Sequence, residues 1–377
     1  MDSYVRSPQA LAEAISAFRR EPLVAVDTEA ASFHKYHDRI YLVQLSTRAD
    51  TAILDPLALT DLTPLGLLLA DRAVEKVFHD ADYDLRILDR DYRFRAANLS
   101  DTRIAAQLSG EPAIGLAALL EKYVGVKVAK EHQKADWSQR PLPADMLAYA
   151  AADTRHLPAL RDALLARLRE LGRLAWAQEE FERLGALRWT GASASDGGTA
   201  DAYLRIKGAK TLTGRQLAAL RELHRWRDEL AARQDKASFR IIGNDALLAV
   251  SRTLPRTRAA LMQTPGLPAT LAARHEAALL EAVGRAFALA DDALPRIERA
   301  ARTPRDPDLE GRVERLKAVR NRVAAELALD AGVLCGRVAL EAVARARPKD
   351  RAGLALVDGL RRWQIEVLGD ELLAALS

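Results

Sequence analysis

The chain has 377 residues, 49% of them hydrophobic and 29% charged, which is typical of a globular protein with two or three domains and excludes a disordered chain. Its one cysteine, Cys335, excludes an internal disulfide and a cysteine-rich zinc site. The sequence has neither a leader-like start nor an apolar run near the ~18 residues of a membrane span, so we expect a cytoplasmic protein. The formal net charge is +4, but residues 1–202 carry −5 and residues 203–377 carry +9.

Strand-like segments occupy the first part of the chain. Runs of apolar and β-branched residues, separated by polar segments and one helical segment, predict four strands. The predicted strands are residues 23–29, 39–47, 51–56 and 75–80.

Helical patterns follow the fourth strand. Residues 101–110 and 115–125 are predicted as helices, and each segment ends in a glycine, the residue expected just past a helix C-terminus. Another helical stretch begins near residue 141 and, apart from Pro158, continues to about residue 185. Strands followed by helices predict an α/β domain in which helices cover a sheet.

A small, polar, glycine-containing segment, residues 190–202, predicts a linker. Beyond it the periodicity is helical, and Pro304 and Pro307 interrupt it. We therefore predict an α/β domain at residues 1–189, a linker at 190–202, and two small all-helical domains at 203–295 and 296–377.

The two helical domains share one order of parts. Each begins with a long amphipathic helix, at residues 217–233 and 313–329. Each continues with a short helix after a small-residue turn and closes with a helix that follows a glycine, Gly266 or Gly359. The repeated order suggests two related modules, although helical bundles in general share these features.

The first predicted strand ends in two carboxylates one residue apart, Asp27 and Glu29. Alternate residues of a strand point to the same face, so two negative charges would lie side by side and need a positive partner. The same spacing recurs at Asp308 and Glu310, but within a polar, proline-containing segment. Only the first pair lies where ligands commonly emerge from an α/β sheet, and two solvated acids at a strand end are the structural alternative.

A second acidic segment, residues 78–88, joins the fourth strand to a helix. Asp80 or Asp82 suits a helix N-cap, and Asp82 can pair with Arg86 four residues later. Asp84 then falls in the first helical turn, where the helix dipole tolerates a negative charge. A structural role for Asp84 explains this segment as well as a functional role does.

A third candidate pair is Tyr149 and Asp153, four residues apart on a predicted helix and therefore on one face. Three alanines separate them, which leaves space around that face. Such a pair is often only a surface hydrogen bond. Pro158 indicates that this helix kinks or ends nearby.

Taken together, the candidate set is four carboxylates and one tyrosine: Asp27, Glu29, Asp84, Asp153 and Tyr149. Carboxylate oxygens suit hard cations such as Mg²⁺ or Mn²⁺, and two such ions would neutralise the crowded acids. Ions ~3.5–4 Å apart activate a water and stabilise the leaving oxygen in phosphodiester displacement. A tyrosine, with an ordinary pKa of ~10, is better suited to hold that water than to take its proton.

Three segments, in order, resemble the exonuclease motifs of the DEDD superfamily in its tyrosine-bearing branch: VAVDTE (24–29), HDADYDL (79–85) and YAAAD (149–153). The segment DWSQRPL (136–142) and the helical modules narrow the resemblance to the ribonuclease D family, over nearly the whole chain. The resemblance implies a ribonuclease H-like mixed sheet carrying a metal-dependent 3′–5′ exonuclease, followed by two HRDC (helicase and ribonuclease D, C-terminal) domains.

The resemblance also implies roles for the candidate residues. Asp27, Glu29, Asp84 and Asp153 match the acids that hold two divalent ions, Mg²⁺ or Mn²⁺, and Tyr149 matches the tyrosine that orients the attacking water. Among the acids of the second segment, the family's acid directly precedes a leucine, which selects Asp84. Family members trim the 3′ ends of tRNA precursors and other small structured RNAs and release nucleoside 5′-monophosphates.

The resemblance gives the uneven charge a meaning. An acidic catalytic part would bind cations, and basic modules would hold the phosphate backbone of RNA, here expected to be tRNA precursors with 3′ extensions. The densest basic cluster just after the linker is Arg205, Lys207, Lys210 and Arg215. A solvated helix surface is the alternative for each of these residues. Nothing in the family resemblance requires a partner chain, so we expect a monomer.

Two other functions stay open on the sequence alone. The first is a 3′–5′ DNA exonuclease, because the same acids cut DNA as well as RNA and only contacts to the 2′-hydroxyl distinguish the two polymers. The second is a non-catalytic nucleic-acid-binding scaffold. Candidate substrate contacts are the backbone N–H of Thr28, and the side chains of Gln44 and His79 beside the expected cleft. Each of the three also suits a purely structural hydrogen bond.

Overall fold

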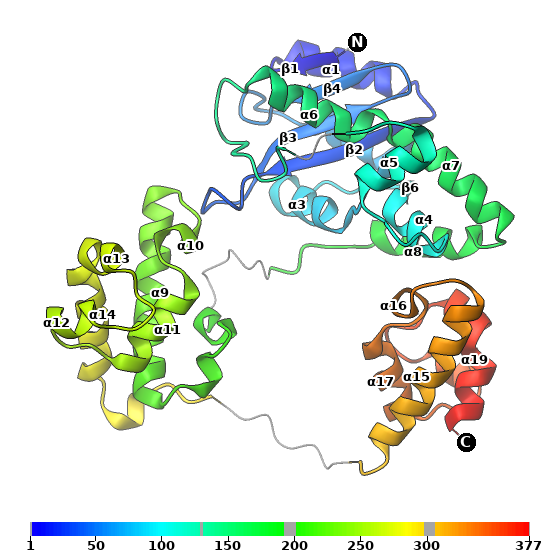
Figure 1. The fold of residues 1–377 in the computed structure, drawn as a ribbon. Helices are drawn as coiled ribbons and strands as arrows, with labels where there is room; N and C mark the ends of the chain where they lie inside the picture. The colour runs from blue at the N-terminus through cyan, green and yellow to red at the C-terminus, as the bar shows by residue number, and fades with distance from the viewer. Residues whose placement is uncertain (1, 129–130, 192–200, 298–305, 377) are drawn as a thin grey trace. The chain divides into compact units, whose positions relative to one another are not determined.

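The computed structural model describes residues 2–128, 131–191, 201–297 and 306–376 (Figure 1). Within these ranges no helix combines the length and the apolar character that crossing a membrane requires. The chain divides into two compact units. The first consists of Met1–Glu29, Ile40–Trp189 and Pro304–Ser377, and the second of Ala30–Arg39 and Thr190–Thr303. Most of the predicted linker, residues 192–200, lies outside the described residues, and the domain limits stay a prediction.

A mixed six-stranded sheet forms the centre of the first unit. Its strands are β1 (Asp2–Val5), β2 (Leu23–Ala30), β3 (Ile40–Ser46), β4 (Thr51–Leu54), β5 (Glu75–Phe78) and β6 (Leu99–Asp101). They lie in the order β1-β4-β3-β2-β5-β6. The pairs β1 with β4, β2 with β5 and β5 with β6 are parallel, and β3 runs antiparallel to β4. The strand that carries the first acidic pair, β2, therefore lies inside the sheet, between β3 and β5.

All four predicted strands are present, and two more were missed. The missed strands, β1 and β6, have only four and three residues, too few to show an alternating pattern. They are held by partners far away in the sequence, as in the pairing of Val5 with Leu54.

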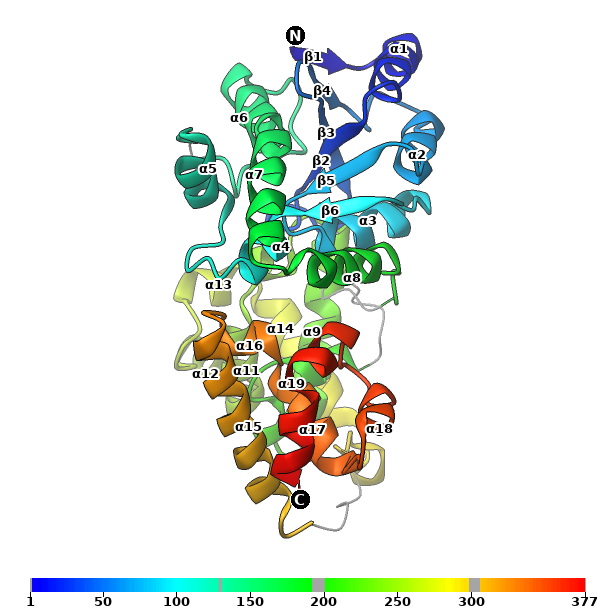
Figure 2. The ribbon, with the colours of Figure 1, turned by 90° about the vertical axis from the view of Figure 1, so that its right-hand side faces the viewer.

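Helices cover both faces of this sheet. They are α1 (Pro8–Phe18), α2 (Thr63–Ala70), α3 (Asp82–Tyr92), α4 (Thr102–Leu108), α5 (Leu116–Val124), α6 (Ala144–Arg155), α7 (Leu157–Glu170) and α8 (Leu174–Gly185). Figure 2 shows α1, α2 and α3 on one side of the sheet and α6 and α7 on the other. Because both faces are covered, every residue of β3 is buried.

The long helical stretch predicted to begin near residue 141 is three helices, so that part of the prediction is wrong. The first break is at His156, and the second spans residues 171–173, where Gly172 has a φ of +68°. Pro158 lies in the first turn of α7, where its missing N–H leaves no hydrogen bond unmade. The helix that carries Tyr149 and Asp153, α6, therefore ends before α7 begins.

The described part of the second unit is helical. After two short 3₁₀ turns, η1 (Ala202–Arg205) and η2 (Ala209–Thr211), come α9 (Gly214–Gln234), α10 (Ser238–Ile241), α11 (Asn244–Thr253), α12 (Arg258–Met262), α13 (Ala269–Arg274), α14 (Glu276–Ala288) and η3 (Asp291–Ala293). Leu220, Leu247 and Leu279, from α9, α11 and α14, belong to one core cluster and are fully buried.

The C-terminal helices are α15 (Leu309–Glu326), α16 (Ala331–Leu334), α17 (Arg337–Ala346), α18 (Arg351–Ala355) and α19 (Arg362–Leu376). They repeat the order of the preceding helical domain. The helices α11 and α17 each end in a left-handed residue, Leu254 and Arg347, and Gly266 and Gly359, the glycines before the closing helices, have φ values of +83° and +91°. The structure thus repeats, part by part, the order predicted for the two modules.

Within the first unit, α19 packs on α8 of the α/β domain. Trp363 stacks on Trp176 with ring centroids 4.9 Å apart, and its Nε1 donates to Glu180 at 2.9 Å. Arg361 Nε also lies 3.0 Å from Glu180. An aromatic stack and a shared carboxylate therefore join the C-terminal helices to the sheet domain.

Candidate active site

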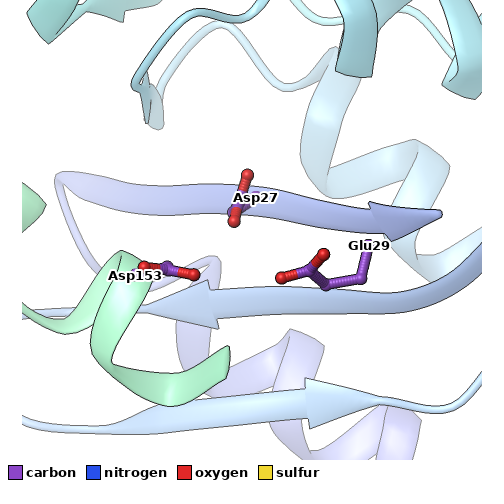
Figure 3. A group of neighbouring side chains, drawn as sticks. All are labelled: Asp27, Glu29 and Asp153. Atoms are coloured by element: carbon purple, nitrogen blue, oxygen red, sulfur yellow. The ribbon is translucent and has the colours of Figure 1, made fainter. Parts of the chain in front are cut away.

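Three of the predicted acids converge beside the sheet. Asp27 and Glu29 come from β2 and Asp153 comes from α6, and one oxygen of each lies within 4.8 Å of the others (Figure 3). Asp27 and Glu29 share a face because they alternate along the strand. Asp153 is fixed by its neighbour Thr154, whose hydroxyl lies 2.7 Å from that of Ser46 on β3.

Tyr149 is part of the same site. Its hydroxyl donates to the Asp153 carboxylate, and its ring neighbours the rings of His132 and Trp137, with centroid distances of 5.5 and 6.2 Å. Burial raises the pKa of Tyr149 well above 10, and the charge of Asp153 raises it further. The phenol therefore stays protonated at neutral pH.

The segment DWSQRPL (136–142) lies next to Tyr149 through Trp137. Trp137 is almost fully buried, with 1% of its surface exposed. Arg140 donates to both carboxylate oxygens of Asp55, at 2.8 and 2.7 Å, and to the carbonyl of Tyr41 at 3.0 Å. This segment is thus tied to β3 and to the end of β4, which fixes Trp137 against the Tyr149 ring.

The electrostatics of the three acids favour a bound cation. Burial raises the pKa of Asp27, Glu29 and Asp153, and repulsion from Asp153 adds to the pKa of Asp27 and of Glu29. Among the described residues no lysine or arginine lowers the pKa of these three acids. The positive partner that the sequence called for is therefore not a side chain of this part of the protein, and an all-oxygen donor set fits a hard divalent ion.

Asp84 lies next to this group but outside it. It is 7% exposed in the first turn of α3, and its Oδ1 accepts a hydrogen bond from the hydroxyl of Thr28. Burial and the charge of Asp27 raise the pKa of Asp84, and Asp84 in turn raises the pKa of Glu29. The structure thus brings three of the four predicted acids together and places the fourth within their electrostatic reach.

The neighbours of Asp84 have arginine partners. Asp82 pairs with Arg86 at 2.6 Å, as expected from their spacing, and Asp80 pairs with Arg103 at 2.7 Å. The side chains of both acids are more than half exposed. Of the three competing acids, Asp84 is therefore the one that is buried and faces the other site acids.

The structure places the three candidate substrate contacts differently. The backbone N–H of Thr28 donates to Asp27 and its hydroxyl donates to Asp84. Gln44 is fully buried in β3, and neither polar atom of its amide has a hydrogen-bond partner within the described ranges. His79 lines a cleft of about 400 Å³ together with Asp27, Asp153 and Tyr149. His79 is thus the candidate that reaches the cleft, and all three assignments stay predictions.

Sequence reasoning missed part of the cleft wall. Arg103 and the first turn of α5, from Gly115 to Ala118, also line it. Arg103 follows β6, a strand too short to predict, and Asp101 at the end of that strand caps α4 through the N–H groups of Arg103 and Ile104. The one available signal was the glycine before α5, which leaves the first N–H groups of this helix without a side-chain cap.

The predicted basic cluster is also rearranged. Arg215 does not belong to it, because its guanidinium donates to the carbonyls of Ala286 and Leu289, at 2.9 and 2.6 Å, and so closes the end of α14. Arg252 comes close instead: a Cβ added at Gly208, whose φ is +103°, would lie 3.3 Å from its Nη2. We call the cluster of Arg205, Lys207, Gly208, Lys210 and Arg252 the Gly208 turn.

Comparison with known proteins agrees with this fold. A family model described as 3′–5′ exonuclease matches residues 3–169, and one described as HRDC domain matches residues 216–283 and 310–376. Ribonuclease D of Gluconacetobacter diazotrophicus is 34% identical over 98% of this chain and 91% of its own length. Ribonuclease D of Escherichia coli is 32% identical over 77% of this chain and 76% of its own length. The crystal structure of Escherichia coli RNase D superposes with a TM-score of 0.72 at 27% identity, over 99% of this chain and 98% of that one.

The fold and the matched domains define a 3′–5′ exonuclease followed by two HRDC domains. Similarity to ribonuclease D over nearly the whole length shows that the chain belongs to the ribonuclease D family. It is a 3′–5′ exoribonuclease, and RNA is its partner. The predicted family, fold class and reaction are confirmed, and the family together with the acidic cluster supports dependence on divalent metal ions.

Proposed function

We propose that this exoribonuclease trims the 3′ ends of tRNA precursors and other small structured RNAs, one nucleotide at a time, and releases nucleoside 5′-monophosphates. The observation that carries the proposal is the convergence of Asp27, Glu29 and Asp153, with Tyr149 bonded to Asp153. The substrate class is supported by the solved relative from Escherichia coli, which is described as an exoribonuclease involved in structured RNA processing. Since all these residues come from one chain, and tRNA is processed in the cytoplasm, we infer a cytoplasmic monomer.

Two divalent ions, Mg²⁺ or Mn²⁺, complete the site in this proposal. Asp27, Glu29 and Asp153 offer oxygens close enough to share an ion, and Asp84 supplies the fourth carboxylate. Their raised pKa values mean that a divalent ion would relieve a repulsion built into the fold. Such a pair of ions, when bound, supplies an activated water and stabilises the leaving oxygen.

Tyr149 orients the attacking water in this proposal. Because its pKa is raised well above 10, the phenol keeps its proton and acts through hydrogen bonds alone. Its ring is fixed by Trp137 and His132, so the position of the hydroxyl is set before substrate arrives.

The direct test is digestion of a tRNA with a 3′ extension by the full chain, with Mg²⁺, with Mn²⁺ and with a chelator, beside a DNA strand of the same sequence. We expect a ladder of products shortened by single nucleotides from the 3′ end, nucleoside 5′-monophosphates as the released product, and no products with the chelator. Internal cleavage, or trimming unaffected by the chelator, would overturn the proposal. Faster trimming of the DNA strand would overturn its RNA part.

A further inference from the structure

His79 and Asp27 line the same cleft. The parallel pairing of β2 with β5 sets Ala25 level with Val77, so two residues further on Asp27 is level with His79. Residues at the same level of neighbouring strands point to the same face of a sheet. His79 directly follows β5, the strand next to the first acidic pair, and it lines the cleft with Asp27.

Hydrogen bonds on one side of the ring fix its tautomer. His79 Nδ1 lies 2.9 Å from the hydroxyl oxygen of Thr102. That hydroxyl donates its single proton to the carbonyl of Phe78, at 3.0 Å, and Thr102 is only 1% exposed. Thr102 therefore accepts from His79, which requires the proton of the neutral ring to be on Nδ1. Nε2 is left as a bare acceptor.

The surroundings keep the ring neutral. Burial and the nearby positive charge of Arg103 lower the pKa of His79 to about 4. Arg103 is itself engaged with Asp80, at 2.7 Å. Within the part of the chain that the structure describes, His79 has no second hydrogen bond. The cleft is thus lined by an uncharged side chain, His79, whose Nε2 can accept a hydrogen bond from a ligand.

We propose that Nε2 of His79 accepts a hydrogen bond from a ribose hydroxyl of the 3′-terminal nucleotide. Phosphate groups next to the scissile bond offer acceptors only, and exocyclic amines differ between bases and are missing from uracil. The 2′- and 3′-hydroxyls are donors present at every RNA end. Recognition through His79 is therefore independent of base, as an enzyme that shortens a chain step by step requires. The inference rests on the proposed trimming function.

The experiment uses three RNA oligonucleotides that are identical except for the last nucleotide, which carries ribose, 2′-deoxyribose or 3′-deoxyribose. The rate of removal of this nucleotide is measured for each end, and the readout is the ratio between ends for one enzyme. We expect the parent to remove the ribose end about tenfold faster than one of the two deoxy ends, the loss that follows from one missing hydrogen bond to a partly buried group.

Variants then assign that preference to His79. His79→Phe removes the acceptor and is expected to bring the ratio to about one. Thr102→Val removes the group that fixes the tautomer and is expected to lower the ratio, whereas Thr102→Ser keeps the hydroxyl and is expected to preserve it. Because each ratio compares two ends with one enzyme, a general loss of folded protein cancels.

The two deoxy ends distinguish two forms of recognition. A preference that depends on the 2′-hydroxyl and vanishes in His79→Phe supports the proposal and makes His79 a selector of RNA over DNA. A preference that depends on the 3′-hydroxyl supports it as recognition of a free 3′ end. A parent that trims all three ends equally, or a His79→Phe variant that keeps the parent's ratio, overturns it. A parent that trims no RNA end with either metal defeats the proposed function instead.

Discussion

The clustered carboxylates of Asp27, Glu29 and Asp153 and the Gly208 turn each concentrate charge of one sign, but they do so in opposite surroundings. Asp27, Glu29 and Asp153 are partly buried, and burial together with mutual repulsion raises their pKa values. Lys207 and Lys210 are exposed to water. Like charges repel strongly in a poorly hydrated cleft and weakly at a screened surface. The first arrangement costs stability and favours bound cations, whereas the second costs little and leaves its positive charges accessible to a polyanion.

The largest effect is expected from neutralising one of the buried acids. Asp27→Asn and Asp153→Asn each remove a ligand oxygen's charge without changing the shape of the side chain, so the rate of nucleotide release at saturating Mg²⁺ should fall roughly 10³-fold or more. Single-turnover trimming of a 3′-extended RNA measures this. Asp308→Asn is the matched control, because Asp308 has the same spacing to Glu310 but lies at the start of α15, and it should keep the parent's rate. Variants of the two site acids that stayed within tenfold of the parent would contradict the assigned site.

The next effect is smaller because it concerns a hydrogen bond and not a ligand. Tyr149→Phe should lower kcat about 10- to 100-fold while the pH–rate profile keeps its shape between pH 7 and 9, since the pKa of this phenol is raised well above 10. Tyr123→Phe is the control: its hydroxyl also donates to an acid, Glu111, away from the cleft residues, and it should leave the rate unchanged. If the parent's rate rose with pH between pH 7 and 9 and Tyr149→Phe abolished that rise, the tyrosine would be acting as a proton acceptor.

The repulsion between the buried acids should be visible as a pH dependence of stability. In the folded state the pKa is raised to about 8 for Asp27 and to about 7 for Asp153, chiefly by burial, above the unfolded value of ~3.9. Their contribution is fully present below that unfolded value and is lost as the pH rises through the folded values. Without divalent ions, these two groups should therefore lower the free energy of unfolding progressively from about pH 4 to about pH 8. Added Mg²⁺ should restore more of it at pH 8 than at pH 6.

Asp153→Asn sharpens this test. It removes one of the repelling charges, so in the presence of a chelator it should raise the free energy of unfolding by about 1–2 kcal/mol at pH 8 and by less at pH 6. Chemical denaturation at both pH values gives these differences. A gain in stability that was the same at the two pH values would show that the effect is packing and not charge.

The sequence alone predicted the long strands and the motifs, because both are local. Strand β3 is apolar except for Gln44 and Ser46, and the acids of β2 share a face through simple alternation. The short strands β1 and β6 could not be predicted, since their pairing with residues far along the chain decides their conformation. Missing β6 also hid Arg103, which lines the cleft from the first helical turn of α4, directly after that strand.

The roles of neighbouring charged residues likewise could not be predicted from the sequence, because they depend on tertiary contacts. Asp82 and Asp84 differ little in sequence, but one pairs with Arg86 at the surface and the other is buried against Thr28. Arg215 looked like part of a basic cluster, yet it serves the carbonyls at the end of α14, and its place is taken by Arg252 from the end of α11. Charge along a sequence does not show which ionic groups the fold has already used.

The smallest effect is expected at the Gly208 turn. Its exposed cations Lys207, Lys210 and Arg252 form no ion pair with the described acidic residues. If they bind phosphates, replacing all three by alanine should weaken RNA binding at low salt and reduce the slope of log K against log salt by about 0.7 to 0.9 for each phosphate that is no longer neutralised. Titration of binding with salt, in the presence of a chelator so that no RNA is cut, gives this slope.

The control for the Gly208 turn lies in the same HRDC domain. Arg233, Lys236 and Arg274 are also exposed and carry the same total charge, but Arg233 and Arg274 lie at the ends of α9 and α13, and Lys236 follows α9. Replacing these three by alanine changes the net charge by the same amount, so a long-range effect of charge alone would lower the slope equally in both triple variants. A slope that falls only when the Gly208 turn is changed would locate the phosphate-binding residues there. Equal slopes in the parent and both variants would show that the Gly208 turn does not bind RNA phosphates. That result would leave the proposed active site unaffected.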